Sequence, residues 1–122
     1  MILNAEILGT EVSESTFYDQ VTGAPRLGFT VNVTALDADT NEKYELQLSN
    51  GFARLDEIKE LRRQGAADDA LRQVADVFRS ELIDQMPRMS RTAFEVLKFK
   101  GKSASYIKLV CRFAQVAASA AA

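Results

Sequence analysis

Histidine is absent from this 122-residue chain, which has one cysteine and two prolines. The absence of histidine removes the most common general base of enzymes and the most common transition-metal ligand. The lone Cys111 excludes an intramolecular disulfide and a thiolate metal cage. No set of residues assembles a nucleophile, a base and an orienting group. We therefore predict that the protein is not an enzyme and needs neither a metal nor another cofactor.

Long hydrophobic runs are missing as well. No stretch approaches the roughly 18 apolar residues that a membrane-spanning helix needs. The first residues, MILNAEILGTEVSES, contain no basic segment followed by a long apolar one, so we expect no secretory signal. These absences predict a protein without membrane contact, in a reducing compartment such as the cytoplasm.

Charge is present in ordinary amount but is unevenly placed along the chain. Residues 1–84 hold 8 Lys/Arg and 16 Asp/Glu, and residues 85–122 hold 7 and 1, which accounts for the 15 bases and 17 acids of the whole chain. A split of this size favours a surface that faces a polyanion. The alternative is that the basic end packs beside the acidic part and the charges pair within the molecule.

Five segments alternate apolar and polar residues with the period of two that is typical of strands. These segments are residues 2–12, 27–36, 43–48, 92–100 and 105–116. The stretch ESTFYDQVTGAPRLGF between the first two contains Asp19, Gly23 and Pro25, so we predict a loop there. Gly9 marks an expected bulge or bend in the first strand.

Between the third and fourth strands the apolar spacing becomes helical. It predicts helices over residues 52–63 and 67–85, with Gly65 and Pro87 at their C-terminal ends. This order resembles the five-stranded OB-fold barrel, in which a helix commonly lies between strands three and four. We thus predict an α+β fold, an OB-like antiparallel barrel or sheet with a helical hairpin, as one domain over residues 1–116. Residues 117–122 are predicted to be a disordered tail.

The last two predicted strands carry most of the basic residues of the C-terminal part. Alternation places Leu109, Cys111 and Phe113 in the core, where Cys111 is inert. If Leu97 and Phe99 also face the core, the opposite face combines aromatic rings and cations. That face then holds Phe94, Lys98, Lys100, Tyr106, Lys108 and Arg112, with Lys102 in the connecting turn.

Rings interleaved with cations are typical of proteins that bind single-stranded nucleic acid, because cations neutralise phosphates while rings stack on bases of any sequence. The loop TFYDQVTGAPR adds Phe17, Tyr18 and Arg26, and it could extend the surface as the first hairpin loop does in many OB-folds. These three and the seven residues of the last hairpin are the candidate nucleic-acid-binding residues. The alternative is that Phe94 and Tyr106 complete a core or a dimer interface while the lysines protect an edge strand.

In this organisation, and in its TGAPR loop, the chain resembles the small single-stranded DNA-binding (helix-destabilising) proteins of filamentous bacteriophages. The resemblance implies a homodimer that coats single-stranded DNA during phage DNA replication, in the host cytoplasm. The helical pair at 52–85 departs from the shortest family members, which contain little helix. A different class of function also fits the residues: a protein-interaction or assembly module, or a phage structural protein, whose basic sheet docks an acidic partner.

Overall fold

The computed structural model describes residues 1–103 and 106–114. Along the chain the elements are β1 (Ile2–Tyr18), β2 (Pro25–Asp37), β3 (Lys43–Leu48), α1 (Ala53–Arg63), α2 (Asp68–Gln85), β4 (Arg91–Lys102) and β5 (Ile107–Phe113). This confirms the predicted α+β class and the two helices between the third and fourth strands. Residues 117–122, where the sequence predicts a disordered tail, lie outside the described residues. Neither helix in the described ranges is both long and apolar enough to cross a membrane.

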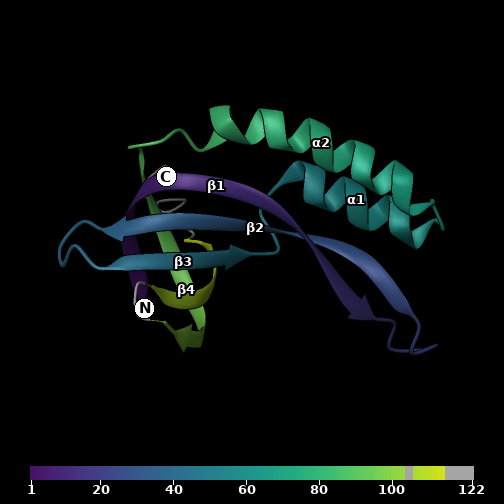
Figure 1. The fold of residues 1–122 in the computed structure, drawn as a ribbon, viewed down its shortest axis with the longest axis horizontal. Helices are drawn as coiled ribbons and strands as arrows, with labels where there is room; N and C mark the ends of the chain where they lie inside the picture. Colours follow the sequence, from purple (N-terminus) through teal and green to yellow (C-terminus); the bar gives the residue numbers. More distant parts are fainter. Residues whose placement is uncertain (104–105, 115–122) are drawn as a thin grey trace, which may run out of the picture.

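The five strands close into a ring in the order β1-β2-β3-β5-β4, with β4 pairing back to β1 (Figure 1). All neighbouring pairs are antiparallel except β3 and β5, which run parallel from Tyr44↔Ile107 to Gln47↔Val110. The prediction of a wholly antiparallel sheet is therefore wrong at this pair. The reason is geometric: five strands in a closed ring cannot all alternate in direction, so at least one pair must be parallel.

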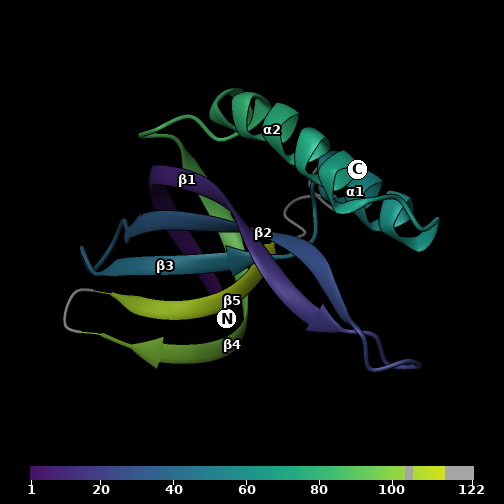
Figure 2. The same cartoon turned by 45° about the vertical axis from the view of Figure 1, so that its right-hand side comes forward.

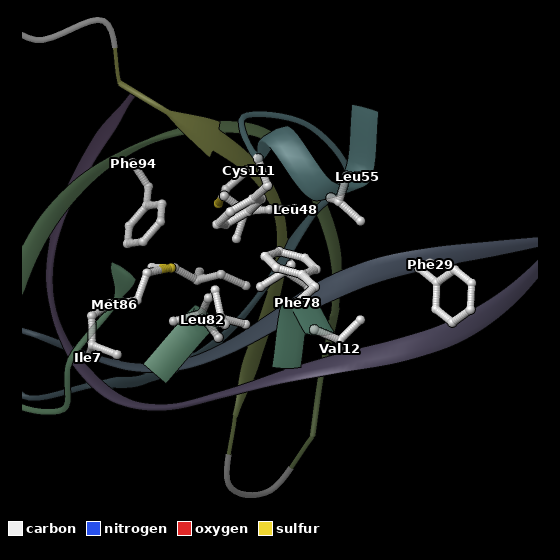
Figure 3. Packing of buried hydrophobic residues seen from close by; sticks show 14 of the residues in the cluster. Ile7, Val12, Phe29, Leu48, Leu55, Phe78, Leu82, Met86, Phe94 and Cys111 are labelled. Atoms are coloured by element: carbon white, nitrogen blue, oxygen red, sulfur yellow. The ribbon is translucent and has the colours of Figure 1, made fainter. Parts of the chain in front are cut away.

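The core lies inside this ring and beneath the helices (Figure 3). The predicted alternation of β2 is confirmed, since Phe29, Val31, Val33 and Ala35 are all buried. Both helices cover one side of the ring and insert apolar side chains, among which Phe78 is fully buried. Its ring lies 5.2 Å from that of Phe52 (centroid to centroid), and the ring of Phe52 lies 5.2 Å from that of Phe113. The helical spacing of apolar residues in 67–85 predicts Val77 on the buried face of α2, but Val77 is 46% exposed.

β1 and β2 are longer than the sequence predicts, and the loop between them shrinks to residues 19–24. The side chain of Asp19 orders this short turn, because Oδ1 accepts hydrogen bonds from the amides of Val21 (2.7 Å) and Thr22 (3.0 Å). Residues 13–18 of β1 pair with residues 25–30 of β2, and this part of β2 has no partner in β3. This two-stranded extension, here called the β1–β2 arm, projects beyond the ring (Figures 1 and 2).

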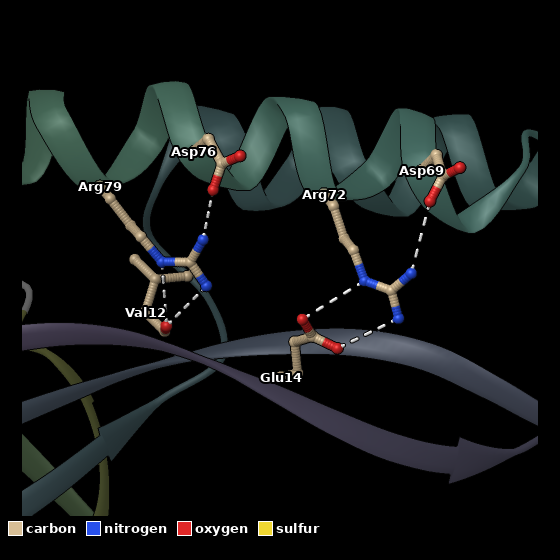
Figure 4. Close-up of polar contacts among 6 residues, drawn as sticks. All are labelled: Val12, Glu14, Asp69, Arg72, Asp76 and Arg79. Atoms are coloured by element: carbon tan, nitrogen blue, oxygen red, sulfur yellow. Dashed lines mark hydrogen bonds and ion pairs between the residues drawn. The ribbon is translucent and has the colours of Figure 1, made fainter.

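Two arginines of α2 hold the base of the β1–β2 arm (Figure 4). The guanidinium group of Arg79 donates two hydrogen bonds, of 3.1 and 3.4 Å, to the carbonyl oxygen of Val12. Arg72 forms an ion pair of 3.3 Å with Glu14. Acids of the same helix also contact these arginines: Asp76 pairs with Arg79, and Asp69 with Arg72. The helices therefore fix the position of the arm relative to the ring.

Candidate functional site

A polar groove of about 480 Å³ lies on the outer surface of β1, β2 and β3. Most of its lining residues alternate with the buried ones, so the pattern that builds the core also builds the groove. The strands contribute Ser13, Glu14, Ser15, Thr30, Asn32, Glu45 and Gln47, and the β4–β5 hairpin contributes Lys100, Lys108 and Leu109. Hydroxyl, amide and ammonium groups thus line one groove. Figure 2 shows the backbones of the β1–β2 arm and the β4–β5 hairpin, which both contribute lining residues.

Lys100 and Lys108 reach the groove from the two strands of the hairpin. A shift of register between Phe99 and Gly101 places Lys100 at a bulge, and its Nζ donates a 2.5 Å hydrogen bond to Oε1 of Gln47. Lys108 is exposed and pairs through its backbone with Gly101 on β4 and with Glu45 on β3. Neither ammonium forms an ion pair with any carboxylate in the described part of the chain. Both charges are therefore available to an anion in the groove.

The other cations of the hairpin divide into open and neutralised ones. Lys98 and Lys102 are exposed and make no ion pair within residues 1–103 and 106–114. Arg112 instead forms a two-pronged contact with Glu95, with N–O distances of 2.9 and 3.0 Å. Hydrogen bonding to Arg112 lowers the pKa of Glu95 and raises that of Arg112, as expected for a mutual ion pair. The sequence left open whether the basic residues pair with acids of the same molecule, and Arg112 does so.

The prediction that Phe94 faces outward is wrong. Its side chain is 0% exposed, and its ring stacks on that of Phe113 at a centroid distance of 5.7 Å. Leu97 and Phe99, predicted in the core, are 50% and 61% exposed. The register shift between Val96 and Lys98 explains the face of Phe94, because alternation carried back from Leu97 and Phe99 across this bulge assigns Phe94 to the wrong side. Leu97 and Phe99 are exposed for a different reason: the pairing of β4 with β1 ends at Glu95, so the strand leaves the core beyond that point.

Phe99 is thus an exposed ring beside the lysines, and the assignment of faces from the sequence missed it. It lies between Lys98 and Lys100, close to Gly101 and Lys102. This run of cations interrupted by one ring and one glycine is a signal that the strand runs past the core. A buried strand rarely carries so many lysines.

The remaining candidates lie on the β1–β2 arm and at the tip of the hairpin. Tyr18 is 68% exposed at the end of β1. Arg26 forms an ion pair of 3.7 Å with Asp19. The backbone of Phe17 pairs with Arg26, and the side chain of Phe17 lies outside what the structure describes. Tyr106 is half-buried, and its carbonyl oxygen accepts a 2.9 Å hydrogen bond from the amide of Ser103.

Acidic side chains also line the groove. Glu14 is paired with Arg72, at 3.3 Å, so its charge is offset. Glu45 forms no ion pair with any residue that the structure describes, and it stands beside Lys108 in the β3–β5 register. The centre of the groove therefore combines two open lysines with one open carboxylate. Both of these lysines belong to the hairpin side of the groove.

The described ranges contain one cysteine and no grouping suited to a metal ion. Burial raises the pKa of the Cys111 thiol to about 11, so the sulfur stays protonated at neutral pH and is a poor nucleophile. No cluster of three or more Cys, Asp or Glu side chains suited to a metal ion occurs among these residues. No model of a known protein family, no curated protein sequence and no solved structure matches this chain. Its function is therefore inferred from the groove and its cations.

Proposed function

We propose that this protein binds single-stranded DNA, independently of base sequence, across the groove between the β1–β2 arm and the β4–β5 hairpin. The observation that carries the proposal is the convergence of Lys100 and Lys108 on the outer face of β2 and β3. The strand order of the ring is that of an OB-fold, and OB-folds bind oligonucleotides on strands two and three between their first and last hairpins. This agreement supports an OB-like identity for the fold.

The chemistry of the groove suits a strand of any sequence. The ammonium groups of Lys100 and Lys108 neutralise phosphates, and Lys98 extends the positive surface along β4. Ser15, Thr30 and Asn32 supply neutral hydrogen-bonding groups that do not depend on one base pattern. Outside the lining of the groove, Phe99 offers an exposed ring on β4, and base stacking on such a ring contributes about 1–3 kcal/mol. Coating of replicated phage DNA by a homodimer is the biological setting that the resemblance to filamentous-phage proteins suggests.

The direct test is fluorescence anisotropy of a labelled oligothymidylate at several chloride concentrations. Binding should weaken as salt rises, and the negative slope of log K against log salt should become shallower by about 1.4 in the Lys100→Ala/Lys108→Ala variant, because two phosphate contacts are lost. Arg88→Ala is the matched control, since this exposed cation lies outside the groove. Absence of binding at low salt, or binding indifferent to salt, would falsify the proposal.

A second candidate function, assembly with a second copy of the chain, rests on the free part of β4. Residues 97–102 of β4 pair with β5 alone within the described chain, which leaves one strand edge open. Leu97 and Phe99 expose apolar surface there, and Ile2, whose strand pairs with β4, is 54% exposed. Light scattering after size exclusion should then show a dimer without nucleic acid, and Leu97→Lys should convert it to a monomer. A monomeric wild-type protein at all concentrations would exclude this candidate.

A further inference from the structure

A second group of cations lies at the far end of the β1–β2 arm from the β4–β5 hairpin. It surrounds a depression of about 280 Å³ between the arm and the C-terminal part of α1. The lining residues are Arg26, Lys59, Arg62, Arg63 and a single acid, Asp19. Here these residues are called the arm–α1 cluster.

Most cations of this cluster are held by neutral oxygens. The guanidinium of Arg26 donates to the carbonyl oxygen of Arg62 (2.8 Å), and the guanidinium of Arg62 donates to that of Leu27 (3.1 Å). Lys59 Nζ donates to the carbonyl oxygen of Ser49 (2.7 Å) and to Oδ1 of Asn50 (2.8 Å). Such partners fix the side chains in place without cancelling their charge. Asp19, on Arg26, and Glu60, on Arg63, contribute negative charge to these contacts.

The positive charge of the cluster is only partly compensated. Burial, and then the charge of Arg26, lower the pKa of Arg62. Arg54 and Arg72, which pair with carboxylates, show the opposite direction of shift. Two guanidinium groups that repel each other in a partly buried place gain from an anion between them. Arg26 and Arg62 both line the depression, so an anion bound there would lie near both guanidinium groups.

Helix capping explains part of the cluster but not all of it. Cations in the last turn of a helix interact favourably with its dipole, which accounts for Arg62 and Arg63. Lys59 lies before that turn, and Arg26 comes from a strand 36 residues away in sequence. Their convergence on one depression is left unexplained by capping alone.

The arm–α1 cluster is continuous with the groove. An intermediate depression of about 210 Å³ shares Ser15 and Thr30 with the groove, and Lys59 and Arg62 with the cluster. An extended ligand that contacts the hairpin lysines and follows these depressions would therefore reach α1. The path passes the open side of the β1–β2 arm, where Phe29 and Leu55 line its floor.

From this continuity we propose that the arm–α1 cluster is a second phosphate-binding site, which holds the backbone of a strand whose other part lies against Lys100 and Lys108. The inference rests on the proposed function, because the ligand is the phosphodiester of single-stranded DNA. It adds a role for the helical insertion: α1 lengthens the binding path beyond the sheet.

Nuclear magnetic resonance on the ¹⁵N-labelled full chain tests the site itself, with sodium pyrophosphate as the probe at constant ionic strength. We expect saturable shifts of amides in residues 19–26 and 59–63. The Asp19→Asn variant keeps an oxygen for the turn amides but removes the one lining acid, and it should bind pyrophosphate about two- to fivefold more tightly. Shifts that fail to saturate, or that spread over all basic residues, mean an adventitious ion only and overturn the site.

Oligonucleotide binding tests whether the arm–α1 cluster contributes to the binding of single-stranded DNA. In Lys59→Gln/Arg63→Gln the negative slope of log K against log salt should become shallower by about 1.4, whereas Arg88→Ala should leave it unchanged. Arg63→Gln alone, whose side chain contacts Glu60 among the described residues, should make the slope shallower by about 0.7 and guards against misfolding of the double variant. Normal binding with an unchanged slope overturns the second site and leaves the groove intact. Failure of the wild-type chain to bind any oligonucleotide overturns the proposed function as well.

Discussion

Close packing around the ring of strands restricts which amino acid can occupy some single positions. Gly51, directly before α1, has a φ of +92°, which disfavours any residue with a Cβ. A Cβ at this position would also lie 2.6 Å from Cδ2 of Phe113. The ring of Phe113 is itself held between those of Phe52 and Phe94. The path from β3 into α1 therefore has no room for a side chain.

We predict that Gly51→Ala destabilises the protein more than Gly65→Ala does. Gly65 also has a positive φ, of +83°, but a Cβ there meets nothing within 4 Å. The second variant isolates the backbone cost, about 1–2 kcal/mol, and the difference between the two reports the clash with Phe113. Urea denaturation measures both, and equal losses of unfolding free energy would show that Phe113 moves aside freely.

Phe94 and Phe99 lie five residues apart on one strand and should respond oppositely to truncation. Phe94→Ala removes a fully buried ring and should cost about 3–5 kcal/mol of unfolding free energy. Phe99→Ala removes a largely exposed ring and should change stability by no more than about 0.5 kcal/mol. Because Phe99 is available for stacking, its loss should weaken oligonucleotide binding by about 1–3 kcal/mol. Unaltered binding by this stable variant would remove Phe99 from the interface.

Among the elements, the two helices act on the β1–β2 arm as well as on the core. On α2, Arg79 donates to the carbonyl oxygen of Val12, and Arg72 forms an ion pair with Glu14. Arg26 of β2 donates to the backbone of α1, and Arg62 of α1 donates to the backbone of β2. A two-stranded extension without such contacts is only marginally ordered in water. The helical insertion thus determines how firmly one wall of the groove is held.

We expect Arg72→Ala/Arg79→Ala to loosen the arm without unfolding the ring. Hydrogen exchange should speed up in residues 13–18 and 25–30, whereas the buried amides of β3 should keep their protection. Arg54→Ala is the control, because Arg54 pairs with Glu57 and Glu81 on the helices and forms no hydrogen bond or ion pair with the arm in the described chain. Equal acceleration in the arm of the control would assign the effect to helix stability instead.

Over the whole molecule, the uneven charge along the sequence places many acidic and many basic side chains on different parts of the surface. Acids are concentrated on the exposed sides of the helices, and most of their arginines are paired with them. Lys100 and Lys108 of the hairpin and Lys59 of the arm–α1 cluster form no ion pair among the described residues, and they stand at two ends of one path. A protein with net charge −2 can in this way present a positive track while most of its surface stays negative.

Glu45 is the open carboxylate on that track, and its neutralisation should strengthen binding. We predict that Glu45→Gln raises affinity for oligothymidylate about two- to fivefold at low salt, with a smaller gain at high salt because the effect is screened. Glu57→Gln, which removes an acid on the helices, should have little effect. Weaker binding by Glu45→Gln would indicate that the carboxylate contacts the ligand directly and would contradict this electrostatic account.

Much of the fold follows from local patterns. Alternation in β2 and β3 and the helical spacing of α1 and α2 identified the elements and most of the buried residues, such as Val31, Leu46 and Phe78. The sequence also predicted that the lysines of the hairpin are exposed, as they are. On β5, for example, Lys108 is next to the buried Leu109 and therefore points to the opposite face. Phe94 was assigned to the wrong face, because a bulge reverses the alternation of a strand and leaves no clear mark in a single sequence. Phe99 was assigned to the core because the sequence does not show where β4 leaves it.

The sequence by itself determined the order of the elements, the apolar faces and the positive character of the C-terminal hairpin, because these depend on neighbours within a few residues. The tertiary structure decided the parallel β3–β5 pair, the point where β4 leaves the core, and the meeting of Arg26 with Arg62. Each of these depends on how segments far apart in the chain pack together. Ring closure and helix docking impose that packing, and no local pattern encodes it.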